Sequence, residues 1–84
     1  MKKKEAYTRL VESGVRPSVQ RLAIMDYLIK HPTHPTIDDV FQALCEELPT
    51  LSRTTVYNTL RMLSEKHAAQ MITIDDHRIC YDGN

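Results

Sequence analysis

The hydrophobic residues of this chain recur at helical spacing over most of its length and give way to strand-forming residues near its end. Helical spacing places apolar residues at i, i+3, i+4 and i+7, and therefore on one face of a helix. The pattern predicts four helices, over residues 2–13, 19–30, 37–48 and 52–66. The third carries the longest apolar stripe, formed by Ile37, Val40, Phe41, Leu44 and Leu48.

The predicted helix boundaries coincide with residues that start or stop helices. Gly14 ends the first helix, and the two prolines of HPTHPT end the second. Ser18 and Ser52 are placed to cap the second and fourth helices with their hydroxyl groups. Thr36 and Asp39 form a capping-box pattern at the start of the third helix, with Asp in place of the usual Glu.

The last part of the chain predicts a β-hairpin. Strand-forming residues flank the segment Asp75-Asp76-His77, namely Met71, Ile72, Ile74, Ile79, Cys80 and Tyr81. The short link from Leu48 to Leu51 joins the third and fourth helices, as in a helix-turn-helix unit. We therefore expect one domain over residues 1–84 that is mainly α: a winged helix-turn-helix with four helices and a two-stranded wing.

Length and charge favour a binding module. Eighty-four residues allow one modest core and no substrate cleft between domains. The formal net charge is zero, but it is +4 for residues 1–30, −4 for residues 31–51 and 0 for residues 52–84. A polyanion meets local patches rather than the mean, so a nucleic-acid partner is not excluded.

Two further features concern location and redox chemistry. The chain has no apolar run long enough to span a bilayer, so we expect a cytoplasmic protein with no membrane partner. Cys45 and Cys80 form no CxxC pair. We expect both to be small buried thiols of the core.

One outer face of the fourth predicted helix carries groups that suit nucleic acid. Arg53, Tyr57 and Arg61 recur at every fourth residue, away from the apolar stripe. Guanidinium forks, hydroxyls, amides and flat rings suit phosphates and base edges, and helix N-termini favour anions. The candidate DNA-binding residues of this helix are Ser52, Arg53, Thr54, Thr55, Tyr57, Asn58 and Arg61.

Two candidates lie outside that helix. Pro17 holds Arg16 extended, so Arg16 projects from a rigid connector, and Gln20 is exposed near the start of the second predicted helix. The acidic outer face of the third helix is expected to lie across or away from nucleic acid rather than in a groove.

Other interpretations stay open at this point. The polar face could belong to an ordinary solvated core helix. Alternatively, the domain is a winged-helix protein-interaction or assembly module, which would expose apolar anchors where this helix exposes Arg, Tyr, Asn and Thr. An enzyme is disfavoured, because the sequence has no paired carboxylates in an apolar setting, no activated nucleophile and no phosphate-binding glycine loop.

Three segments resemble the N-terminal half of ferric-uptake-regulator family proteins: GVRPSVQRLAIMDYL, HPTIDDVFQAL and TTVYNTLRML. The resemblance spans roughly residues 10–82 and implies a dimeric, metal-dependent bacterial transcription factor, expected to be a repressor, that binds a double-stranded DNA operator. It also implies a separate C-terminal dimerisation and metal-sensing domain, which this chain lacks. We therefore expect a homodimer for the full-length parent and a monomer for these 84 residues.

The resemblance also assigns roles to single residues. Tyr57 matches the family tyrosine that packs on thymine methyl groups, and Arg16 matches the basic residue that reaches into the minor groove. Asn58 stands where many iron-sensing members have arginine, which favours the peroxide-sensing branch. Family identity varies at the position of Arg53. His67 departs from the usual helix-ending glycine, and the acidic wing turn departs from a glycine-rich one.

The resemblance places two metal ligands of the peroxide-sensing branch in this chain, His34 and Asp82. It implies Fe²⁺, Mn²⁺ or Zn²⁺ for the full-length parent, whose other ligands would lie beyond Asn84. Because stable sites need about four donors, we expect no strongly bound cofactor here. Within this chain we expect His34 to be a loop histidine and Asp82 a solvated residue past the wing.

Overall fold

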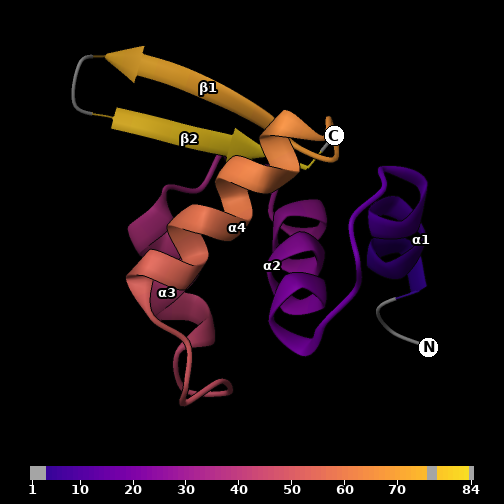
Figure 1. Cartoon of the computed structure of the whole chain (residues 1–84). Helices are drawn as coiled ribbons and strands as arrows, with labels where there is room; N and C mark the ends of the chain where they lie inside the picture. Colours follow the sequence, from indigo (N-terminus) through magenta and orange to yellow (C-terminus); the bar gives the residue numbers. More distant parts are fainter. Residues whose placement is uncertain (1–3, 76–77, 84) are drawn as a thin grey trace.

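The computed structural model describes residues 4–75 and 78–83 and consists of helices and one antiparallel hairpin (Figure 1). The elements are α1 (Lys4–Glu12), α2 (Val19–Lys30), α3 (Ile37–Leu44), α4 (Arg53–Glu65), β1 (Gln70–Asp75) and β2 (Arg78–Asp82). The predicted set of four helices followed by a hairpin is confirmed. The predicted turn residues Asp76 and His77 lie outside the described residues.

All three predicted N-terminal caps are present. The hydroxyls of Ser18 and Ser52 each accept a hydrogen bond from the backbone N–H three residues on, at 3.2 and 3.1 Å. Thr36 and Asp39 form a reciprocal capping box, with bonds of 3.2 and 3.0 Å. Each cap satisfies backbone donors that the first turn of a helix leaves unpaired, so the starts of these helices are determined locally.

Helices α1 and α4 end in the same way with different residues. After each helix, one backbone N–H reaches back five residues to a helix carbonyl at 2.8 Å. The turn requires a left-handed residue, which is Gly14 (φ +79°) after α1 and His67 (φ +63°) after α4. Glycine adopts this conformation without cost, whereas histidine pays a steric penalty. His67, which stands where a glycine usually ends this helix, is therefore a position of backbone strain.

Helix α3 is one turn shorter than its apolar stripe predicts. It ends at Leu44, and Cys45 is its C-terminal cap. Residues 45–47 form turns, because Pro49 disfavours helical backbone at the preceding Leu48. Leu48 still packs against the core. The expectation for Cys45 was wrong: the residue is only partly buried, while Cys80 is buried as predicted.

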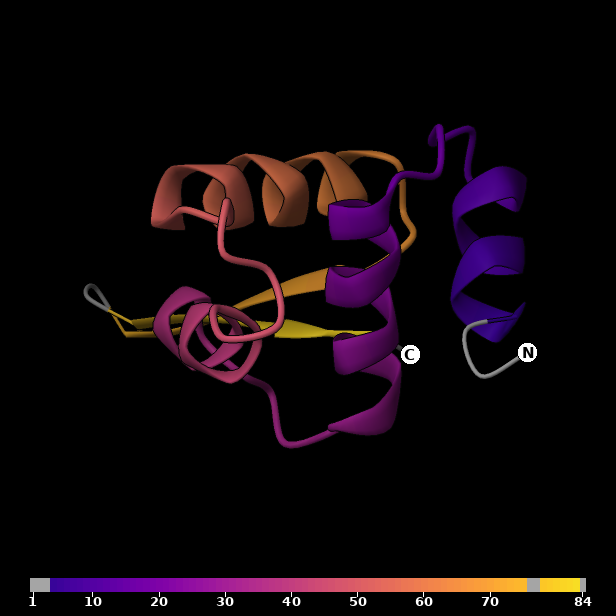
Figure 2. The ribbon, with the colours of Figure 1, turned by 90° about the horizontal axis from the view of Figure 1, so that it is seen from below.

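The core lies between α2, α3, α4 and the hairpin. Its fully buried large side chains are Leu10, Ile24, Met25, Leu28, Val40, Val56, Leu60, Leu63 and Tyr81. Helix α1 packs on the side of α2 that faces away from α3 and α4 (Figure 2). It contributes Ala6 and Leu10 to the core, while Tyr7 and Val11 are half exposed. Among the described residues, α1 packs mainly against α2, so only a narrow stripe of it is buried.

The hairpin is attached to the loop that precedes α3. Met71 pairs with Tyr81 and Ile72 with Cys80 across the two strands. Cys80 also forms a bridge to Thr36, and the backbone N–H of Tyr81 donates to the carbonyl of Pro35 at 2.9 Å. This third segment continues the antiparallel register, so residue 34 lies opposite residue 82.

In the part of the chain that the structure describes, no helix has the length and apolar character needed to cross a membrane.

Candidate nucleic-acid interface

Helix α4 divides cleanly into a buried face and an exposed face. Val56, Thr59, Leu60 and Leu63 are buried against the core. Five of the side chains that the sequence placed on the outer face of this helix are exposed, namely Arg53, Thr54, Tyr57, Asn58 and Arg61, whereas Thr55 is partly buried. We call these five residues the groove face. The structure therefore brings them together on one surface.

Two of the candidate hydroxyls are committed to the helix cap. Ser52 Oγ accepts from the backbone N–H of Thr55, and it lies 3.0 Å from the Thr55 hydroxyl oxygen. These residues set the start of α4 and hold its first turn. Their structural role is established by these bonds, whereas a contact with DNA remains an expectation.

The two candidates outside α4 lie at the start of α2. The expectation of an exposed Gln20 was wrong: Gln20 is partly buried and donates to Thr50 Oγ1 at 3.3 Å, so it lies beside the turn that leads into α4. Arg16 is exposed, and its carbonyl accepts from the guanidinium of Arg21 at 2.9 Å. This bond stabilises the connector while leaving the Arg16 side chain in solvent.

An apolar hollow of about 240 Å³ separates α4 from the hairpin. It is lined by Tyr57, Arg61, Ser64, Glu65, Met71, Ile79 and Tyr81. Met71 and Ile79 are 52% and 41% exposed, and sequence reasoning assigned neither a role. Alternation along the two strands could have indicated that both share a face with buried Tyr81. Burial, with a smaller contribution from the Tyr57 phenol, raises the pKa of Tyr81.

Both guanidinium groups of the groove face already have carboxylate partners. Arg53 Nε donates to Asp38 Oδ1 at 2.8 Å, and Arg61 Nε lies 3.5 Å from Glu65 Oε2. The Arg53 guanidinium also lies over the ring of Phe41, with 4.5 Å between Cζ and the ring centroid. Asp38, an acid of the outer face of α3, thus lies beside the first residue of the groove face.

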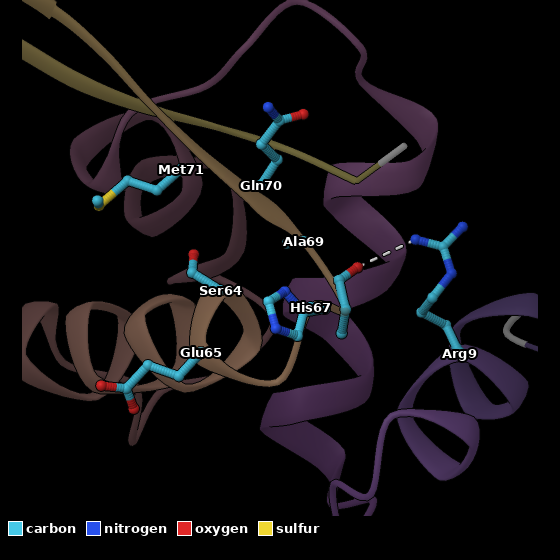
Figure 3. Close-up of a pocket in the computed structure, with 8 residues that line it drawn as sticks. Arg9, Ser64, Glu65, His67, Ala69, Gln70 and Met71 are labelled. Carbon is cyan, nitrogen blue, oxygen red and sulfur yellow. Dashed lines mark hydrogen bonds between the residues drawn. The ribbon is translucent and has the colours of Figure 1, made fainter.

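A larger hollow, of about 600 Å³, lies at the C-terminal end of α4 (Figure 3). Arg9 of α1 lines this hollow, and its guanidinium donates to the carbonyl of Ala68 at 3.0 Å and to that of Gly83. Gly83 has no room for a side chain, because a Cβ there would lie 2.9 Å from backbone atoms of Leu28 and Ile29. Arg9 thus links α1 to the end of the hairpin. Its guanidinium stabilises the fold at this hollow.

The two predicted metal ligands lie side by side. His34 Nδ1 is 3.8 Å from Asp82 Oδ2, and the two side chains are 48% and 19% exposed. The expectation of a solvated Asp82 past the wing was wrong, since Asp82 is the last residue of β2 and partly buried. The expectation of a loop histidine is confirmed for His34, whose φ of +59° is left-handed.

The geometry of this pair fits one half of a metal site. Two donors that each lie about 2.1 Å from an ion are at most about 4.2 Å apart, so both atoms are able to bind the same ion. A second histidine of the same loop is held by Tyr27 instead: His31 Nδ1 lies 2.9 Å from the Tyr27 carbonyl oxygen, and its ring stacks on Tyr27. Among residues 4–75 and 78–83, no group of three or more His, Cys, Asp or Glu residues is arranged to hold an ion.

The family model described as Ferric uptake regulator family matches residues 12–84. The chain belongs to this family. The peroxide operon regulator of Bacillus subtilis (strain 168) is 42% identical over 79 residues, which cover 94% of this chain and 54% of that relative. The peroxide-responsive repressor PerR of Staphylococcus aureus (strain USA300) is 39% identical over 80 residues, which cover 95% and 54%. The chain spans about half the length of the curated relatives it matches.

Solved structures of the ferric uptake regulator family share the fold. PerR from Streptococcus pyogenes matches with a TM-score of 0.82 and 29% identity, over 96% of this chain and 56% of that chain. A zinc-bound manganese uptake regulator matches with a TM-score of 0.86 over 96% of this chain and 61% of that chain, and its 22% identity shows the fold alone. The predicted winged-helix fold is confirmed.

Proposed function

We propose that this chain binds double-stranded DNA sequence-specifically and is the DNA-binding part of a transcriptional regulator. The observation that carries the proposal is the groove face: five polar side chains exposed on one side of a capped helix whose other side is buried. Membership of the ferric uptake regulator family supports the same conclusion. The function is therefore binding rather than catalysis.

The residues of the groove face have distinct proposed roles. Helix α4 enters the major groove with its N-terminal end, where its backbone dipole favours the negatively charged DNA. Tyr57, beside the apolar hollow, packs on thymine methyl groups, and Asn58 and Arg61 offer donors to base edges or phosphates. Thr54, Thr55 and Ser52 contribute hydroxyls at the entrance of the groove. Arg16 and Gln20, at the start of α2, contact the neighbouring backbone or minor groove.

We also propose that the parent regulator is a metal-dependent repressor of the peroxide-sensing type. Two relatives at about 40% identity carry peroxide-responsive names, and Asn58 fits that branch. His34 and Asp82 would contribute two of the ligands for Fe²⁺, Mn²⁺ or Zn²⁺. When bound, the ion would supply positive charge and a link between the loop before α3 and β2.

The remaining ligands and the dimer contacts belong, in this proposal, to the half of the relatives' length that these 84 residues do not match. Residues 1–84 then act as one DNA-binding module per subunit of a homodimer, each contacting one half-site. One module alone forgoes the avidity of a tethered pair, so its affinity is lower than that of the dimer.

The second candidate function is a winged-helix protein-interaction module. The observation that favours it is the exposure of Met71 and Ile79 beside Tyr57, since exposed apolar side chains are typical anchors of protein interfaces. The polar groove face immediately beside them favours DNA, because guanidinium and amide groups match base edges and phosphates.

Selection from a random library of duplexes tests the proposal. The 84-residue chain is expected to enrich one sequence, and fluorescence anisotropy is expected to show tighter binding to the enriched duplex than to a scrambled duplex of equal composition. The logarithm of the affinity should fall linearly with the logarithm of salt concentration, since phosphate contacts release counterions. Equal affinity for both duplexes would leave only non-specific binding and would contradict the proposal.

A further inference from the structure

Arg53, the first residue of α4, turns its side chain back onto α3. Its Nε donates to Asp38 at 2.8 Å, and its guanidinium lies over the ring of Phe41. Asp38 and Phe41 are three residues apart on α3, so both reach the same side of that helix. A flexible side chain is thus held from two directions.

These contacts leave the far edge of the guanidinium available. Asp38 takes the Nε hydrogen and Phe41 covers one face of the plane. The terminal nitrogens Nη1 and Nη2 have no hydrogen-bond partner among the described residues. The side chains of Arg53 and Asp38 are 58% and 68% exposed, so a ligand reaches this edge without displacing the core.

We propose that Asp38 and Phe41 are positioning residues that aim Arg53 at a base edge in the major groove. This proposal rests on the proposed function. Arginine loses rotamer freedom when it is immobilised on a ligand, and a side chain already held by the protein loses less. The terminal N–H groups form a fork that matches paired acceptors such as O6 and N7 of guanine.

The charge of Asp38 favours a base over a phosphate as the partner of Arg53. A phosphate on the terminal nitrogens would lie close to the Asp38 carboxylate, and two anions at short range repel each other. A guanine edge presents two acceptors without a net charge and avoids this repulsion. Asp38 therefore improves discrimination: it supports the contact made on cognate DNA and disfavours the phosphate contact made on any DNA.

The test compares Asp38→Asn with the unchanged chain on the enriched and scrambled duplexes. The substitution keeps the shape of residue 38 and removes its charge. The ratio of the two affinities is expected to fall about 3- to 10-fold, with affinity for the scrambled duplex rising about 2-fold. Asp38→Glu, which keeps the carboxylate, should retain most of the ratio. Phe41→Leu should lower the ratio as well, with thermal unfolding confirming that the variant is folded.

Two controls separate positioning from a general charge effect. Asp38→Asn in an Arg53→Ala background should leave the ratio unchanged, because the residue that Asp38 positions is gone. Glu46→Gln removes the same charge from an exposed residue that has no ion pair within the described residues, and it should also leave the ratio unchanged.

Three results would overturn the proposal: an unchanged ratio in Asp38→Asn, an equal fall in the Arg53→Ala background, or an equal fall in Glu46→Gln. If the unchanged chain enriches a duplex and one of these results is found, only this inference fails. If the unchanged chain enriches no duplex, the proposed function fails and this inference fails with it.

Discussion

The groove face of α4 and the pair of His34 and Asp82 differ in how much of a site each one forms. The groove face is a continuous surface with its donors, its aromatic ring and its supporting contacts from α3 present in the described residues. The pair provides two donors 3.8 Å apart, with no third ligand arranged around them in that part of the chain.

This difference separates DNA binding, which the groove face provides, from metal-dependent regulation, which needs a complete metal site. A surface built on one helix acts as soon as the helix folds, whereas two donors bind an ion weakly until further ligands complete the coordination. We therefore expect DNA binding by these 84 residues to be independent of metal, although we propose that the parent regulator depends on it. The following predictions test each side of this comparison.

The largest expected effect comes from Tyr57→Ala. Affinity for the enriched duplex should fall roughly 5- to 150-fold, because one base contact supplies about 1–3 kcal/mol of discrimination. Affinity for the scrambled duplex should change little, since the substitution removes no charge. Fluorescence anisotropy on both duplexes measures the two affinities.

Tyr7→Ala is the matched control for Tyr57→Ala. Tyr7 is 50% exposed and Tyr57 is 44% exposed, but Tyr7 lies on α1, on the other side of α2 from α4. Tyr7→Ala should change neither affinity. Equal losses on both duplexes for Tyr57→Ala would rule out a base-reading role for Tyr57.

The residue pattern alone predicted the groove face, whereas His34 and Asp82 were named only by the family resemblance, for a physical reason. The outer face of a helix follows from a period of 3.6 residues, so Arg53, Tyr57 and Arg61 were placed together by spacing alone. His34 and Asp82 meet because the loop before α3 pairs with β2 through Thr36 and Cys80. That pairing joins segments more than 40 residues apart, and no local pattern encodes its register.

The same distinction explains the smaller corrections. Caps at Ser18, Thr36 and Ser52 were predicted because each depends on residues within three positions. The partner of Arg53 was missed, because Asp38 lies 15 residues earlier on another helix. The exposure of Tyr7 likewise depends on how α1 packs against the rest of the domain rather than on the local pattern.

A smaller effect is expected on stability from His67→Gly. The left-handed backbone at residue 67 costs a non-glycine residue about 1–2 kcal/mol, and the greater freedom of glycine in the unfolded chain offsets part of the gain. We expect a gain of about 1 kcal/mol, or roughly 4–8 °C in melting temperature for a domain of this size.

Calorimetry measures the stability change, and anisotropy should show unchanged DNA affinity, because His67 lies beyond the C-terminal end of α4. Gly14→Ala is the converse control, since the same left-handed turn at φ +79° should lose stability when alanine replaces glycine. A loss of stability in His67→Gly would contradict the assignment of strain to this turn.

The smallest effect is expected from metal. Calorimetric titration of the 84-residue chain with Mn²⁺ or Zn²⁺ at neutral pH should give weak heats without fixed stoichiometry, and His34→Ala should change them little. Affinity for the enriched duplex should be the same with and without a chelator. A saturable one-to-one isotherm of low micromolar affinity that is lost in His34→Ala would show that a working site exists in this half.

The most direct test of the account is a map of where DNA touches the chain. Backbone amide NMR signals of the 84-residue chain should be followed during titration with the enriched duplex. The account predicts that the largest shifts fall on residues 52–61 and on residues 16–20, while the amides of Tyr7 and Val11 on α1 stay in place. Largest shifts on α1, or shifts that are the same with the scrambled duplex, would contradict the claim that α4 reads DNA.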